Sequence, residues 1–142
     1  MRHYANDSYQ EAEILSADPL QLVRLLYRGA LDEIVGARGC LAKRDIAGRA
    51  RAINKAIRIV AELALSLNHE QGGSISRDLV ELYDYIQRLL IDANCRQVDE
   101  PLAEAHKLMT TLQEAWDNCV PPAHRRKGAE EDCEYAPINC AG

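Results

Sequence analysis

His106 is the residue of this sequence that could most directly carry chemistry. A solvent-facing histidine on a helix can accept a phosphoryl group, and phosphotransfer bundles use such a residue, often followed by Lys and by a Gly that makes room for the phosphate. Lys107 does follow His106, but no Gly occurs for many residues afterwards. We therefore interpret His106 as an ordinary exposed histidine, and a histidine phosphotransfer-type signalling bundle stays as an alternative.

The other side chains that could act as catalysts or ligands form no recognisable site. Glu130 and Glu131 are adjacent carboxylates, but they stand in a charge run that is typical of a solvated segment. Cys119, His124 and Cys133 lack the ligand spacing of a zinc site. The chain has five cysteines without a Cys-x-x-Cys pair, which we interpret as free thiols or small core residues: Cys40, Cys95, Cys119, Cys133 and Cys140. We predict no catalytic residue, no cofactor and no metal.

Composition restricts the class of protein further. The 142 residues fit one domain, and an apolar content of 47% is enough for a packed core. A net charge of −5 argues against nucleic-acid binding, which needs clustered cations. No apolar stretch is long enough to span a bilayer, and the polar, acidic N-terminus is unlike a signal peptide. We expect a cytoplasmic protein that is not inserted in a membrane.

The elements that would position these side chains are predicted to be helices. Asp18 is suited to cap a first helix, with Pro19 at its first position and Gln21 completing a capping box. Apolar residues then recur with the 3.6-residue period as far as Lys43-Arg44, whose cations suit a helix C-terminus.

Three further helices follow by the same criteria. Asp45 is predicted to cap the second helix, which we expect to end at Gly72-Gly73. The third helix begins near Ser74. The fourth begins near Asp99 and ends before Pro121-Pro122. Because the connections are short, successive helices should be antiparallel.

The predicted fold is therefore all-α, an antiparallel up-down four-helix bundle. We assign residues 18–120 to the bundle. Residues 1–17 are irregular but partly apolar, and we expect them to lie against the bundle as an N-terminal cap segment. Residues 121–142 contain charge blocks without apolar periodicity, which predicts a disordered tail.

The second and third helices carry more apolar residues than one stripe needs. The additional positions at helical spacing are Ala52, Ala56, Ile59 and Leu63, followed by Val80, Tyr83, Leu90 and Asn94. They indicate either a wide core face, because each bundle helix contacts two neighbours, or an apolar groove that receives a partner helix. Periodicity alone does not separate the two interpretations.

Several motifs together resemble a known family. The most specific block runs from Gly72-Gly73-Ser74-Ile75 through Leu82-Tyr83-Asp84-Tyr85-Ile86 to Ala93-Asn94. Leu26-Tyr27-x-Gly29-Ala30 and the ten-residue separation of Tyr9 from Pro19 agree with it. In this order the motifs resemble those of the FliS family, the flagellin-specific export chaperones of bacteria. Arg28 departs from the acidic or amide residue that is common in the family at that position.

The resemblance implies a cytosolic chaperone. Members of the family bind the disordered C-terminal segment of flagellin, prevent premature polymerisation and assist delivery to a component of the flagellar type III export gate. Their N-terminal segment is thought to cover part of the groove until the client displaces it. A self-associating structural or regulatory bundle, which would include a homodimer, stays as a second alternative.

We accordingly predict three groups of partner-binding residues. Tyr9 and Ile14 are candidates for the cap over the groove. The candidates for the groove floor are Ile59, Leu63, Tyr83 and Leu90. Asn54 and Asn94 are candidates for satisfying polar groups of the client, with exposed helix polar residues as the simpler interpretation.

Overall fold

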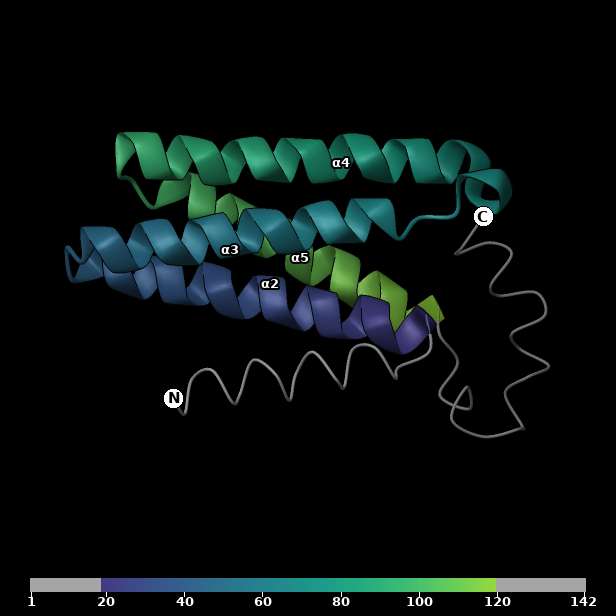
Figure 1. Ribbon diagram of the computed structural model, residues 1–142, viewed down its shortest axis with the longest axis horizontal. Coiled ribbons are helices and arrows are strands. Elements are labelled where there is room, and N and C mark those ends of the chain that lie inside the picture. The colour runs from purple at the N-terminus through teal and green to yellow at the C-terminus, as the bar shows by residue number, and fades with distance from the viewer. Residues whose placement is uncertain (1–18, 120–142) are drawn as a thin grey trace.

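The computed structural model describes residues 19–119, and within this range four helices follow one another (Figure 1). They are α2 (Pro19–Ala42), α3 (Ile46–Leu65), α4 (His69–Arg96) and α5 (Glu100–Cys119). Between residues 19 and 119 there is no strand, so the all-α prediction is confirmed. The predicted cap segment and tail, and the capping residue Asp18, lie outside the described residues.

The four helices form an antiparallel up-down bundle. Helices α2 and α4 each pack against both α3 and α5, so the helices occupy the corners of a square. Each helix runs opposite to the one before it (Figure 1). The connections span only residues 43–45, 66–68 and 97–99, as expected for neighbouring antiparallel helices.

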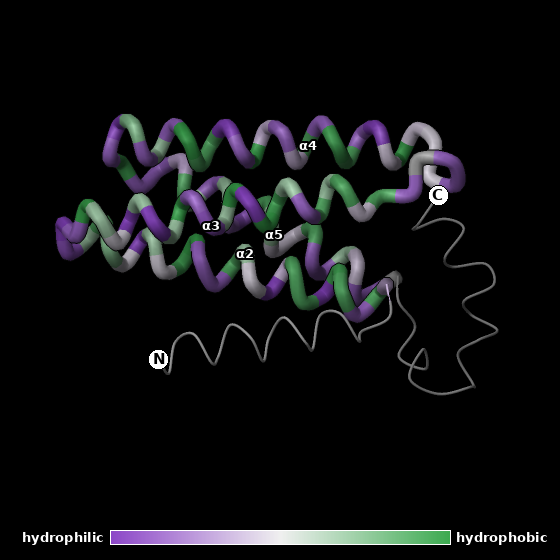
Figure 2. Tube along the Cα trace, in the orientation of Figure 1, coloured by the Kyte–Doolittle hydropathy of each residue, from purple (hydrophilic) through white to green (hydrophobic). Residues whose placement is uncertain are grey.

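Aliphatic side chains, two tyrosines and one methionine fill the core between the helices. Figure 2 shows hydrophobic residues recurring along each helix at the spacing of one face. The largest fully buried side chains are Tyr27, Tyr83, Ile34, Ile53, Leu63, Ile86, Leu90, Leu102, Met109 and Val60. Gly29 of α2 faces α3, since a Cβ atom at this position would lie in van der Waals contact with Ile59 Cδ1, at 3.4 Å. Trp116, on α5, is partly buried and packs against the same core.

The start of α3 confirms the predicted cap. The Asp45 carboxylate accepts a hydrogen bond from the Gly48 N–H at 2.9 Å, which satisfies a backbone donor of the first turn. A Cβ atom at Gly48 would overlap the Asp45 carboxylate and would lie 2.9 Å from Cys40 Sγ. Glycine at this position therefore leaves room for the cap.

The predicted end of the second helix is wrong. Helix α3 ends at Leu65, and Asn68 starts α4 by accepting a hydrogen bond from the Gln71 N–H at 3.0 Å. Gly73 does have a positive φ of 54°, but it kinks α4 rather than ending α3. The signal that locates this boundary is the capping-box pattern of Asn68 and Gln71, three residues apart.

Candidate functional site

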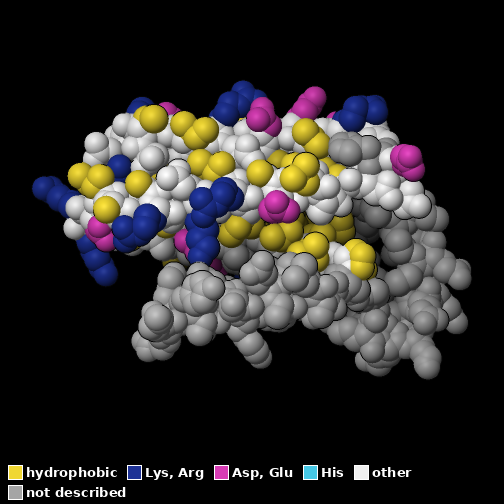
Figure 3. All heavy atoms as spheres, viewed as in Figure 1, with side chains coloured by type: hydrophobic (Ala, Val, Ile, Leu, Met, Phe, Trp, Pro, Cys, Tyr) yellow, Lys and Arg dark blue, Asp and Glu magenta, His cyan; other side chains and the backbone are white. Residues whose placement is uncertain are grey.

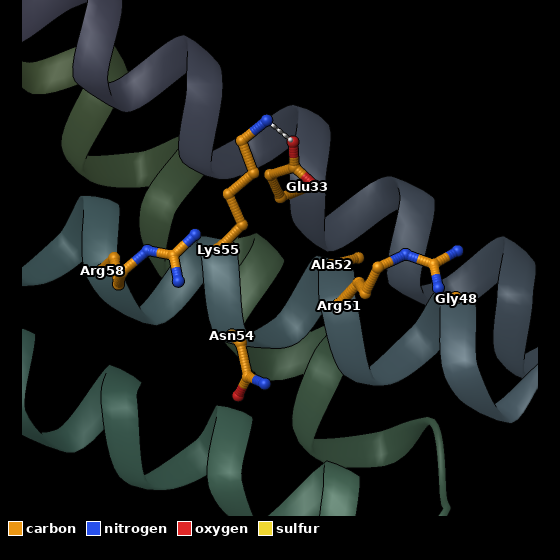
Figure 4. A pocket seen from close by; sticks show the side chains of 7 residues that line it. All are labelled: Glu33, Gly48, Arg51, Ala52, Asn54, Lys55 and Arg58. Atoms are coloured by element: carbon orange, nitrogen blue, oxygen red, sulfur yellow. Dashed lines mark ion pairs between the residues drawn. The ribbon is translucent and has the colours of Figure 1, made fainter. Parts of the chain in front are cut away.

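An open groove of about 570 Å³ lies on the outer face of α3. Its lining residues are Glu33, Gly48, Arg51, Ala52, Asn54, Lys55 and Arg58 (Figure 4). Helix α3 supplies all of them except Glu33, which comes from α2. Arg51, Lys55 and Arg58 are exposed and recur at helical spacing, so three cations share one face of α3.

The cations of this groove are only partly neutralised. Lys55 Nζ lies 3.5 Å from Glu33 Oε2 across the α2–α3 seam. The Arg51 and Arg58 side chains both extend along α3 toward the end of the groove at Gly48 (Figure 4). Within the described part of the chain neither of these two arginines has an ion pair. The groove therefore offers an anionic partner two guanidinium groups without an ion pair and the ammonium group of Lys55, which has one long ion pair with Glu33.

Three of the predicted groove-floor residues are buried in the core. Leu63 and Tyr83 are 1% exposed and Leu90 is 0% exposed. Ile59 is half-buried and packs against the same core. The additional stripe thus provides a wide core face in this structure. A contact of these side chains with a client stays a prediction.

The two core tyrosines form a polar contact in the centre of the bundle. Tyr27 Oη of α2 lies 2.6 Å from Tyr83 Oη of α4, with the ring centroids 6.5 Å apart. Burial raises the pKa of both hydroxyl groups above the usual tyrosine value, because the charged phenolate would be desolvated. The nearby Trp116 side chain acts in the opposite direction on the pKa of each hydroxyl group. The pair is therefore neutral at physiological pH.

The predicted polar residues Asn54 and Asn94 have different surroundings. Asn54 is exposed on the rim of the groove. Asn94 is half-buried, and its side-chain oxygen accepts a hydrogen bond from Arg49 Nε at 3.0 Å. Arg49 is 5% exposed and also reaches Asn94 O and Gln97 Oε1, each at 3.4 Å. Asn94 is thus engaged within the bundle, and sequence reasoning missed its partner Arg49.

Large apolar side chains are exposed on three of the four helices. They are Val35 of α2, Ile46 and Leu65 of α3, and Tyr85 and Ile91 of α4. Leu65 is the most open, with 77% of its surface exposed. Figure 3 shows hydrophobic side chains alternating with Lys and Arg on one face of the molecule. Ile46 continues the main apolar stripe of α3 but is exposed at the first position of the helix.

The remaining candidates do not gather into a second site. Tyr9 and Ile14 lie outside the described residues. His106 is half-buried on α5. Between residues 19 and 119, no three His, Cys, Asp or Glu side chains are placed to hold a metal ion. None of the described helices combines the length and the hydrophobicity that crossing a membrane requires.

The outer faces of the described bundle present exposed apolar and basic side chains that could contact another molecule, and the described residues form no recognisable catalytic site. Fold and surface together define a helical-bundle binding protein. Comparison with known families gives a match to "Flagellar protein FliS" over residues 1–123. This match covers the whole bundle, so the chain belongs to the FliS family of flagellar secretion chaperones, which is a family of chaperones and not of enzymes.

Individual relatives agree with the family match. The chain is 37% identical to the flagellar secretion chaperone FliS of Salmonella typhimurium over 124 residues, which is 87% of this chain and 91% of the relative. It is 32% identical to the flagellar secretion chaperone FliSB of Pseudomonas aeruginosa over 82% of this chain and 92% of the relative. With FliS of Bacillus subtilis, identity is 29% over 80% of this chain and 84% of the relative.

Proposed function

We propose that this chaperone binds the C-terminal segment of flagellin in the cytoplasm, prevents its premature polymerisation and helps to deliver it to the flagellar type III export apparatus. The observation that carries the proposal is the family match across the entire bundle. The relatives are named flagellar secretion chaperones, and the motifs of α2 and α4 resemble those of chaperones that are specific for flagellin.

The distribution of exposed apolar residues supports a client that is laid along the bundle. Ordering some twenty disordered residues costs on the order of 20–40 kcal/mol of backbone entropy. At about 25 cal/mol per Å², offsetting that cost requires roughly 1,000–1,500 Å² of apolar burial in addition to new helix hydrogen bonds. A single pocket is too small for this, whereas Val35, Leu65 and Ile91 offer contacts on three helices.

Within this proposal, the predicted site residues take two roles. Ile59 and Asn54 contact the client directly, because they are at least partly accessible on α3. Leu63, Tyr83 and Leu90 support that surface from beneath. Asn94 keeps the end of α4 in place through Arg49. Tyr9 and Ile14 cover the surface before the client binds.

Calorimetric titration with the C-terminal segment of the flagellin from the same organism tests the proposal. We expect one-to-one binding with a strongly negative heat-capacity change, because folding of the client buries apolar surface. Replacing Leu65 and Ile91 with Ser should weaken binding at least about tenfold, since each exchange removes roughly 1–2 kcal/mol of apolar burial. Ala115→Ser on α5 is the matched control, because Ala115 is also exposed.

The proposal is wrong if the intact protein gives neither heat nor a complex with the flagellin segment. Light scattering over a range of concentrations then tests whether a second copy of the chain covers the exposed apolar residues instead. Incubation with a phosphodonor tests the remaining alternative, because a phosphotransfer bundle would be labelled at His106.

A further inference from the structure

Charge is divided unequally between the two halves of the bundle. Residues 19–65, which contain α2 and α3, carry nine Lys and Arg against four Asp and Glu. Residues 66–119, which contain α4 and α5, carry four Lys and Arg against ten Asp and Glu. The α3 groove therefore lies on the basic half of a protein whose net charge is negative. Its cations attract an acidic segment at a defined place on the surface.

Two of the three arginines of α4, Arg88 and Arg96, form ion pairs within their helix, in contrast to Arg51 and Arg58 of the α3 groove. Arg88 binds Asp84 at 2.7 Å and Arg96 binds Asp92 at 2.7 Å, in both cases four residues apart on α4. Helix α3 has only one acidic residue, Glu62, and no ion pair forms between it and Arg58 in the described structure. Arg51 and Arg58 thus form no ion pair with an acid of their own helix.

The chain contains a segment with the matching charge. Glu130-Glu131-Asp132-Cys133-Glu134 places four carboxylates within five residues. It stands outside the described range and beyond residue 123, where the family match ends. The three cations of the groove, spread over about 10 Å of α3, are comparable in number and extent to these four carboxylates.

The segment is long enough to reach the groove. Helices α3 and α5 both end at the same end of the bundle (Figure 1). Ten residues lie between Cys119 and Glu130, and the eleven residue steps from one to the other correspond to about 36 Å of extended chain. The path around the bundle to Arg58 is roughly 20–25 Å, from helix spacings of about 10 Å and seven residues of helical rise.

We infer that the acidic segment at residues 130–134 docks in the basic groove of Arg51, Lys55 and Arg58 on α3 of the same chain. Attachment to α5 raises the effective concentration of the segment to the millimolar range, so weak exposed ion pairs suffice to populate the contact. This inference does not depend on flagellin, because both components belong to the chain itself.

Carbodiimide cross-linking of the full-length protein tests the inference, because the reagent joins a lysine amine directly to a carboxylate that contacts it. The chain has four lysines, of which Lys55 lies in the groove and Lys107 lies on the acidic half. Mass spectrometry of the monomer should show residues 130–134 linked to Lys55 in clear excess over Lys107. The link between Lys55 and Glu33 serves as an internal standard, since that ion pair is part of the bundle.

The expected changes are specific to charge. Exchanging Arg51 and Arg58 for Gln should lower the yield of the cross-link between Lys55 and residues 130–134 about five- to tenfold. About 0.5 M salt should lower that yield by a similar factor. The cross-link between Lys55 and Glu33 should persist after the exchanges. Exchanging Arg88 and Arg96 for Gln is the matched control and should change nothing. Equal linkage to Lys55 and Lys107, insensitivity to the Arg51 and Arg58 exchanges, or links found only in covalent dimers would each overturn the inference.

Discussion

Replacing Arg49 with Met is expected to destabilise the bundle more than any other exchange of an arginine on α3. Arg49 is 5% exposed, and its guanidinium group binds the side-chain oxygen of Asn94, the Asn94 carbonyl and the Gln97 side chain. The Asn94 carbonyl is among the last four carbonyl groups of α4, for which the helix itself provides no N–H donor. The Arg49 cation also faces the negative C-terminal end of the dipole of α4.

The magnitude follows from the lost contacts. A hydrogen bond to a charged group contributes about 1.5–3 kcal/mol, and a partly buried cation at a helix C-terminus adds up to ~2 kcal/mol. Met preserves most of the apolar contact of the Arg stem, so we expect Arg49→Met to lower the free energy of unfolding by about 2–4 kcal/mol. Arg49→Lys should cost about half as much, because the ammonium group keeps the charge but not the planar set of donors.

Urea denaturation followed by circular dichroism at 222 nm measures this effect. Arg51→Met is the matched control, since Arg51 lies two residues further along α3 and is exposed. It should change the free energy of unfolding by less than about 0.5 kcal/mol. If Arg49→Met is no more destabilising than Arg51→Met, the capping role assigned to Arg49 is incorrect. A double-mutant cycle with Asn94→Ala then measures how much of the effect passes through that pair.

Two further predictions concern the tyrosine pair and the glycines. Tyr27→Phe and Tyr83→Phe should each cost about 1–2 kcal/mol, while the double variant costs less than their sum, because it strands no buried hydroxyl group. Because folding raises the pKa of both hydroxyl groups, the tyrosine pair stabilises the folded state only while both hydroxyls are neutral. Its contribution to the free energy of unfolding is therefore complete below pH 10 and falls as the pH rises beyond it. Urea titrations at pH 9 and pH 11 should show a smaller alkaline loss in the double variant. Gly73→Ala should destabilise by about 1–3 kcal/mol because φ is positive there, whereas Gly36→Ala, in open space on α2, should stabilise by about 0.5–1 kcal/mol in the same measurement.

Much of the fold could be predicted from local signals. Asp45 caps α3 because a short acceptor side chain precedes a helical run, and this pattern is visible in the sequence alone. The double glycine misled the prediction because a glycine with positive φ can end a helix or kink one. The outcome depended on Asn68, whose side chain starts the next helix five residues before Gly73.

The surface was harder to predict than the core. Periodicity identifies residues that can be buried, but it does not tell whether a second apolar stripe faces a neighbouring helix or a client. Leu90 is in the core because α4 packs against both α3 and α5, which is a property of the assembled bundle. Arg49 and Asn94 are 45 residues apart in sequence, and no local pattern indicates that they meet.

The hydroxyl contact between Tyr27 and Tyr83 also affects how the helices can slide past each other. A core made only of leucine and isoleucine could shift by one helical turn, about 5.4 Å, and still bury similar apolar area. Such a shift would separate Tyr27 Oη from Tyr83 Oη and leave both hydroxyls without partners in an apolar interior. Helices α2 and α4 occupy diagonal corners of the bundle, and each belongs to a different helix hairpin, α2–α3 or α4–α5. The single hydroxyl pair therefore fixes the position of one hairpin relative to the other along the bundle axis.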